Sequence, residues 1–233
     1  MNHLQTIFQR PWQVRRPLVT RYMETRFAED FFRDGSLRLS SFRRFRQYAD
    51  EVRGDAFEGR ANQTWLHPDG GKSAIVGMNG GRCFILCGAS SEGPEIAEAF
   101  GTNDGFRILD TLSFADAISR YIPGFLHGVE GLCLYREDVS LTKRMPQMFS
   151  VDDEANMGPA MEHFEKAVRD EAVDSYFIKR RQYANQCEYR LIWIALGDEV
   201  DYIDIKCPEA RQFTERLSQP GDEKEGPRLP RRA

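Results

Sequence analysis

The sequence lacks an apolar stretch long enough to cross a membrane. Of its 233 residues, 41% are hydrophobic, but no apolar run reaches the roughly 18 residues that a membrane span needs. The first ten residues, MNHLQTIFQR, also lack the apolar segment of a signal peptide. We therefore expect a cytoplasmic protein without a membrane partner.

The sequence is also poor in metal-ligand patterns. Its five cysteines are an odd number, and four of them lie in apolar stretches, as buried free thiols do. Cys83 and Cys87 are four residues apart, but the run between them is typical of a strand, and no second pair of Cys or His at ligand spacing follows. These observations predict free thiols in a reducing compartment and no metal site.

Lysine is absent from the segment between Arg10 and Arg46, where ten arginines stand against four acidic residues. The segment therefore has an excess of six positive charges in a chain whose net charge is −4. The forked donors of arginine suit phosphate or carboxylate groups. Two interpretations stay open: a solvated surface that pairs with the acidic segment 152–174, or a face that binds phosphate.

Hydrophobic periodicity predicts an α+β chain with one main domain over 18–217. Residues 1–17 form an irregular lead-in, and residues 218–233, rich in Pro, Gly and charge, form a disordered tail. Expected strands cover 18–23, 36–41, 74–78, 82–87, 105–110, 131–135, 186–196 and 200–205. Expected helices cover 26–33, 42–48, 94–100, 114–120 and 159–173, the last extended by 176–181.

Turn residues and caps add detail to these elements. The run Asn79-Gly80-Gly81 predicts a β-hairpin between its flanking strands, and Gly197-Asp198 predicts another. Thr25 and Ser113 are the expected helix N-caps. Gly35 is the expected end of the first helix.

No P-loop, dinucleotide-binding or zinc-protease motif is present. Short motifs occur instead in a definite order. Arg21-Tyr22 lies on the first strand, Ser40-Ser41-Phe42 lies at the end of the second, and Cys87 lies on a middle strand. Gly105 precedes a later strand, and Gln186-Cys187-Glu188-Tyr189-Arg190 opens the most apolar one.

This order resembles a widespread, poorly characterised bacterial family, which in turn is similar to the ADP-ribosyltransferase fold. The likeness covers about residues 18 to 195. It implies a mixed, mainly antiparallel, split β-sheet core with peripheral helices. The sequence departs from the bacterial pattern where Gly88-Ala89-Ser90 stands in place of Phe-Ser, and where Gln186 stands in place of Glu.

The resemblance implies an enzyme that uses NAD as a substrate and transfers ADP-ribose to a macromolecule, either nucleic acid or protein. It implies a toxin or anti-phage effector, with an antitoxin as a candidate partner. Glu188, Gln186 and Arg21 fit the catalytic positions of such enzymes. The residues expected to bind NAD are Arg21, Tyr22, Ser40, Ser41 and Phe42.

The chemistry needs these residue types for physical reasons. Loss of nicotinamide leaves an oxocarbenium-like ribose, and a carboxylate that accepts a hydrogen bond from the ribose 2′-hydroxyl stabilises the developing charge. Glu188 is suited to that role. Residues two apart on a strand share a face, so Gln186 is expected beside Glu188, where its amide can orient an acceptor but cannot remove a proton.

Three alternatives stay open. Glu188 and Arg190 could form a same-face ion pair on a half-solvated sheet, with no catalytic role. The fold could be a binding module with a degenerate site that contacts nucleic acid or a partner protein through its Arg-rich N-terminal face. A nuclease is a weaker idea, based on an acidic cluster that could hold a metal ion: Asp50, Glu51, Asp55 and Glu58.

Overall fold

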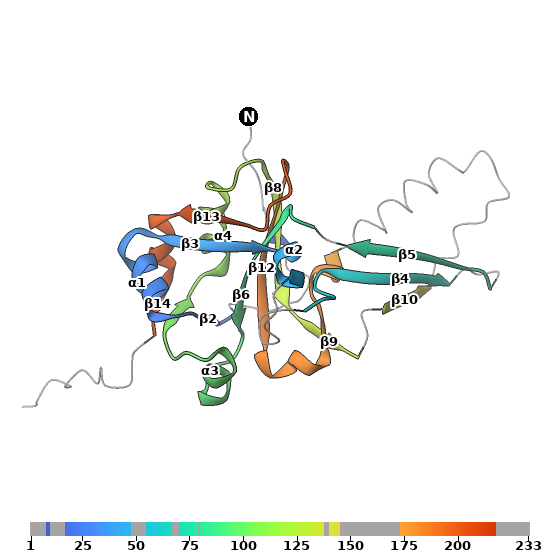
Figure 1. Cartoon of the computed structure of the whole chain (residues 1–233), viewed down its shortest axis with the longest axis horizontal. Helices are drawn as coiled ribbons and strands as arrows, with labels where there is room; N and C mark the ends of the chain where they lie inside the picture. Colours follow the sequence, from blue (N-terminus) through green and yellow to red (C-terminus); the bar gives the residue numbers. More distant parts are fainter. Residues whose placement is uncertain are drawn as a thin grey trace, which may run out of the picture.

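A computed structural model describes residues 8–9, 17–47, 55–66, 70–78, 80–137, 140–144 and 173–217. These residues form a mixed α+β structure with a mainly antiparallel, open sheet and few helices (Figure 1). The predicted α+β class is therefore confirmed. None of the helices in this part of the chain is long and apolar enough to cross a membrane.

The main sheet has β12 near its middle, between β8 and β6. Only the contact of β1 with β8 is parallel. The strands run in the order β1 (Phe8–Gln9), β8 (Phe125–Leu132), β12 (Glu188–Ala195), β6 (Cys83–Ala89), β2 (Val19–Tyr22), β7 (Gly105–Ile108) and β14 (Thr214–Arg216), with β3 (Ser36–Ser41) also on β6 and β13 (Tyr202–Lys206) on β3.

The sheet forks at one edge of β6. Ser40 of β3 pairs with Ile85 near the start of β6, whereas Thr20 of β2 pairs with Ala89 at its end. Among the described residues, no strand pairs with residues 86–88 on that edge. One branch of the fork is therefore β3 with β13, and the other is β2 with β7 and β14.

Strand β12 is apolar at every position from Leu191 to Ala195 because both of its faces are covered. Leu191 and Trp193 belong to a core cluster with Phe31 and Phe114. Ile192, on the opposite face, belongs to a second cluster with Phe42. The helices that supply these aromatic rings are α1 (Thr25–Asp34), α4 (Thr111–Ser119) and α2 (Phe42–Gln47).

The remaining elements lie around the main sheet. β4 (Arg60–Leu66), β5 (Lys72–Met78) and β10 (Ser140–Arg144) form a separate sheet that projects to one side in Figure 1. A short parallel pair joins β9 (Leu134–Arg136) to β11 (Ile178–Arg180). The other helical segments are α3 (Pro94–Phe100) and the 3₁₀-helices η2 (Val173–Tyr176), η3 (Arg181–Gln186) and η4 (Pro208–Phe213).

Both predicted hairpins are wrong. β5 pairs with β4, while β6 pairs with β12, so the glycines between them do not close a two-stranded turn. Gly81 instead allows a close backbone approach, because a Cβ there would lie 2.9 Å from the backbone nitrogen and oxygen of Val200. After Gly197, β13 leaves β12 and pairs with β3 across the fork.

Several local predictions also need correction. Thr25 lies inside α1, which follows Glu24 without a side-chain cap. Asp110, not Ser113, caps α4, and its carboxylate accepts a hydrogen bond from the Ser113 amide at 3.1 Å. Residues 176–181 do not form an α-helix: they contain the last residue of η2, the strand β11 and the first residue of η3. The predicted strand over 131–135 is interrupted at Cys133, between β8 and β9.

Other predictions are confirmed, wrong in part or lie outside the described residues. Gly35 ends α1 in the left-handed conformation, with φ of 78°. All five cysteines are free thiols. The predicted irregular lead-in is wrong at Phe8 and Gln9, which form β1 and pair with β8, and its residues 1–7 and 10–16 lie outside the described residues. The predicted helix over 159–173, apart from its last residue, and the predicted tail over 218–233 lie outside the described residues.

Candidate functional site

A cavity of about 690 Å³ opens where the sheet forks. Its walls include Arg21 of β2, Ser40 of β3, Ile85 and Cys87 of β6, and Glu188 of β12. Ligand pockets are typically about 300–1,000 Å³, so the cavity is large enough for a small-molecule substrate.

The cavity brings together five of the seven residues that the sequence singled out. Arg21, Tyr22, Ser40, Gln186 and Glu188 all line it, although the first three lie more than 140 residues before the last two. The long separation means that the fold, not local sequence, creates this grouping.

Ser41 and Phe42 do not line the cavity, which corrects two predicted NAD contacts. Both side chains are fully buried. Ser41 pairs with Phe84 of β6 and faces the core. Phe42 stacks on Tyr176, with ring centroids 5.9 Å apart. Neither side chain can contact a ligand in this arrangement, because core packing already surrounds it.

Arg21 has a structural contact at the fork. Its Nη1 donates a hydrogen bond of 2.7 Å to the carbonyl oxygen of Cys87. Cys87 lies in the stretch of β6 that neither β2 nor β3 pairs. A backbone carbonyl that is partly buried needs a donor, and the guanidinium supplies it while still lining the cavity.

Gln186 and Glu188 lie together, but not for the predicted reason. Gln186 ends η3, and β12 begins only at Glu188, so the two residues are not on one strand. Between them Cys187 adopts a left-handed backbone with φ of 44°. Lys179 joins the two side chains: its Nζ donates to Gln186 Oε1 at 2.8 Å and also to Glu188 Oε2.

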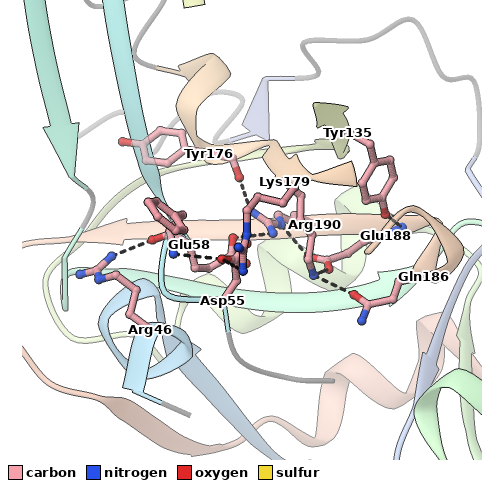
Figure 2. A network of polar contacts seen from close by, with 11 residues as sticks. Arg46, Asp55, Glu58, Tyr135, Tyr176, Lys179, Gln186, Glu188 and Arg190 are labelled. Atoms are coloured by element: carbon pink, nitrogen blue, oxygen red, sulfur yellow. Dashed lines mark hydrogen bonds and ion pairs between the residues drawn. The ribbon is translucent and has the colours of Figure 1, made fainter. Parts of the chain in front are cut away.

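Glu188 belongs to a buried ionic network shown in Figure 2. Arg190 Nε donates to Glu188 Oε1 at 2.6 Å, and Arg190 Nη2 lies 2.6 Å from Glu58 Oε1. The alternative of a Glu188–Arg190 ion pair is thus confirmed, but the pair is buried rather than half-solvated, with exposed fractions of 3% and 1%. Lys179 and Glu58 were not expected in the site.

These contacts set the ionisation of the two carboxyls differently. Burial alone would raise the pKa of Glu188, but Arg190 and Lys179 outweigh it and lower that pKa well below its ordinary value. Burial dominates at Glu58 and raises its pKa above the ordinary value, against the opposing effects of Arg190 and Lys179. Groups with shifted pKa values that share a cavity are typical of functional sites.

Aromatic rings form another part of the cavity wall. Tyr22 stacks on Phe100 with ring centroids 5.5 Å apart, and both residues line the cavity. Phe27 also lines it and is 48% exposed, with the Arg26 guanidinium 4.5 Å from its ring centre. Planar heterocycles bind well against such rings.

The Arg-rich N-terminal segment is largely paired within the described residues. Its acidic partners come from the same segment and from the region around β13, whereas most of the predicted partner segment, 152–172, lies outside the described residues. The pairs include Arg26–Glu24, Arg33–Asp30, Arg38–Asp204 and Arg43–Asp201.

The acidic residues near Glu58 do not form a metal cluster in the described structure. Asp55 pairs with Arg180 at 2.9 Å, and Glu58 faces Arg190. Asp50 and Glu51 lie outside the described residues. Within the described ranges, no group of three or more His, Cys, Asp or Glu side chains could hold a metal ion.

Comparison with known proteins gave no match: no protein-family model, no curated protein and no solved structure is significantly similar to this chain.

Proposed function

We propose that the chain transfers ADP-ribose from NAD to a macromolecular acceptor, nucleic acid or protein, within the cavity at the fork. The observation that supports this proposal is the grouping of Arg21, Ser40, Gln186 and Glu188 around one cavity. The sequence resemblance named these residues independently of any structure. Neither helical nor strand periodicity in the sequence predicts that these four residues lie together.

The state of Glu188 suits the reaction. Its low pKa keeps the carboxylate ionised at neutral pH. A carboxylate has about four lone-pair sites, and Lys179 and Arg190 each occupy one of them. A ribose 2′-hydroxyl can therefore still donate to Glu188 and stabilise positive charge at the anomeric carbon as nicotinamide leaves.

The other cavity residues have matching roles in this proposal. Arg21 contributes positive charge and N–H donors for the pyrophosphate. Tyr22 and Phe100 offer an aromatic wall for nicotinamide or adenine, a role that the buried Phe42 cannot take. Gln186, held by Lys179, orients the acceptor. A toxin or anti-phage role, with an antitoxin as partner, belongs to the same proposal.

A second candidate is a binding module with the same cavity and no catalysis. The observation that favours it is that Arg21 donates to a backbone carbonyl and both oxygens of Glu188 already accept hydrogen bonds. In this case the cavity binds a nucleotide-like ligand, or the N-terminal face binds nucleic acid, and no bond is broken.

Labelled NAD, incubated with the full chain and a cell lysate, separates the two candidates. We expect transfer of label by the wild type and a loss of at least about 100-fold in Glu188→Gln, as for removal of a group that stabilises transition-state charge. Glu137→Gln is the control, because the Glu137 side chain is 79% exposed and pairs with the exposed Arg181. Binding of NAD without transfer or hydrolysis would favour the binding module.

A growth assay tests the biological role. Expression of the wild type is expected to slow bacterial growth, and expression of Glu188→Gln at the same level is not. Equal toxicity of the two proteins would contradict an enzymatic toxin.

A further inference from the structure

Two carboxylates of the cavity share one guanidinium. Arg190 contacts Glu188 Oε1 through Nε and Glu58 Oε1 through Nη2, both at 2.6 Å. Glu58 and Glu188 both line the cavity and are nearly inaccessible elsewhere. Figure 2 shows them on either side of Arg190, from the turn before β4 and from the start of β12. The cavity therefore holds a second acid beside the predicted one.

The two carboxylates differ in their hydrogen bonds. Glu188 accepts from both Lys179 and Arg190. Glu58 Oε1 is buried but has no hydrogen-bond partner within the described structure. Its contact with Arg190 is an ion pair whose angles do not meet those of a hydrogen bond. A buried oxygen that lacks a donor and lines a cavity is available to a hydroxyl or amine that enters that cavity.

The proposed reaction needs a proton acceptor that the predicted residues do not provide. The amide of Gln186 cannot remove a proton near neutral pH. Among the described residues, no histidine lines the cavity. The remaining acids of its wall are engaged at the rim: Glu24 with Arg26, Asp30 with Arg33 and Asp204 with Arg38.

On the basis of the proposed transfer reaction, we propose that the Glu58 carboxylate is its general base. The ribose C1′–nitrogen bond of NAD breaks, and nicotinamide leaves with the bonding electron pair. The acceptor oxygen or nitrogen bonds to C1′, and its proton moves to a Glu58 oxygen and then to solvent. Glu188 stabilises the ribose while Glu58 takes the proton, so the two acids have separate tasks.

The charged groups around Glu58 are consistent with this division. Arg190 contacts its carboxyl, and the charges of Lys179, Glu188 and Asp55 also act on it, although Asp55 itself pairs with Arg180. Arg46 of α2 donates to the backbone carbonyl of Glu58 at 2.8 Å. Burial raises the pKa of Glu58, while the cations lower the pKa of Glu188. Two acids whose pKa values are driven apart by their surroundings are a usual sign of distinct proton-transfer roles.

Azide provides the test, because it is an anionic nucleophile with no proton to lose. The full-length wild type, Glu58→Gln, Glu188→Gln and Asp55→Asn are each incubated with NAD, with and without sodium azide. Nicotinamide, ADP-ribose and ADP-ribosyl azide are then measured. Asp55 is the matched control, since it lies in the same turn, is buried and ion-paired, but does not line the cavity.

We expect Glu58→Gln to lose at least about 100-fold in NAD hydrolysis. Azide is expected to restore its turnover with ADP-ribosyl azide as product, but not to restore Glu188→Gln. Hydrolysis by the wild type is expected to rise with pH as Glu58 loses its proton, and Glu58→Gln is expected to lose this dependence.

Each other outcome has a definite meaning. The role of Glu58 is overturned if Glu58→Gln hydrolyses NAD at the wild-type rate. It is also overturned if azide does not restore the lost hydrolysis, or if Asp55→Asn loses as much. Each of these results leaves the proposed function intact. If the wild type yields neither ADP-ribose nor ADP-ribosyl azide and also transfers no label to the lysate, the proposed function itself fails, and the role of Glu58 fails with it.

Discussion

Lys179 connects two side chains that the backbone does not place on a common strand face. Its ammonium bonds Gln186 and Glu188 at once, while only 8% of the residue is exposed. A buried ammonium is costly unless its partners compensate for lost hydration. The geometry of the predicted Gln-x-Glu motif therefore depends on a residue seven positions before it, outside the motif.

Replacement of Lys179 by methionine tests this dependence. The variant keeps a long side chain but leaves Glu188 with Arg190 alone. We expect the free energy of unfolding to fall by about 3–5 kcal/mol, the usual cost of removing one partner of a buried pair. Urea unfolding followed by circular dichroism measures it. Arg181→Met, which breaks an exposed pair with Glu137, should cost at most about 1 kcal/mol.

Glu58 makes a separate prediction about stability and pH. Its pKa is raised in the folded state from 4.5, so the stability linked to its protonated form is present below pH 4.5 and is lost as the pH rises through the folded pKa. Glu58→Gln cannot ionise. We therefore expect the stability of the variant, relative to the wild type, to increase as the pH rises above 4.5.

Urea unfolding of both proteins at several pH values measures this difference. A relative stability of Glu58→Gln that falls with rising pH would mean that Arg190 and Lys179 lower the pKa of Glu58 instead. The measurement needs no substrate, so it tests the environment of Glu58 separately from its catalytic role.

At the scale of elements, the position of β2 depends on Gly105. Its φ is 146°, and a Cβ there would overlap the carbonyl oxygen of Arg21. The glycine lets β7 approach β2 closely, and this approach fixes the strand that carries Arg21 and Tyr22 into the cavity. Arg21 is therefore placed by a residue on the neighbouring strand as well as by its own.

Gly105→Ala is expected to destabilise the protein by about 2–3 kcal/mol more than Gly101→Ala. Both glycines have positive φ, but a Cβ at Gly101 would meet nothing within 4 Å. The pair separates backbone strain, which both variants share, from collision with β2. Thermal or urea unfolding measures the difference, and equal destabilisation would show that contact between β7 and β2 does not limit the packing.

Local patterns predicted most elements but not their pairing. Ser36–Ser41 and Pro94–Phe100 have the predicted bounds, because alternation and helical spacing are local properties. The glycines near residue 80 were misinterpreted as a hairpin, since a glycine that closes a turn and a glycine that admits a distant backbone have the same sequence signal.

The same limit applies to the candidate site. Arg21, Ser40 and Glu188 could be named because a sequence resemblance marked them. Lys179 could not be named, and Glu58 was named only within an acidic cluster that could hold a metal ion. A single lysine or glutamate in a short segment has no periodicity, and only the tertiary structure brings the two residues to Glu188. Ser41 and Phe42 show the converse: Ser41, next to Ser40 on β3, alternates into the core, and Phe42 is buried where the chain turns into α2.

At the scale of the whole molecule, the forked sheet makes binding and stability interdependent. The cavity is lined by both branches of the fork, with Arg21 on one and Ser40 on the other. A ligand that contacts both branches stabilises the folded state by mass action, because the unfolded chain has no such cavity. NAD is expected to act in this way if the proposed function holds.

Thermal unfolding with NAD tests that expectation. NAD at about 100 times its dissociation constant adds about 2.7 kcal/mol, which should raise the Tm by about 5–10 °C for a chain of this size. Ser40→Phe fills the cavity and should abolish the increase, whereas Ser91→Phe, at an exposed position outside the cavity wall, should retain it. An equal increase in the Tm of Ser40→Phe would place NAD elsewhere on the molecule. If NAD does not raise the Tm of the wild type, tight NAD binding is excluded, because a ligand that binds only the folded state must stabilise it.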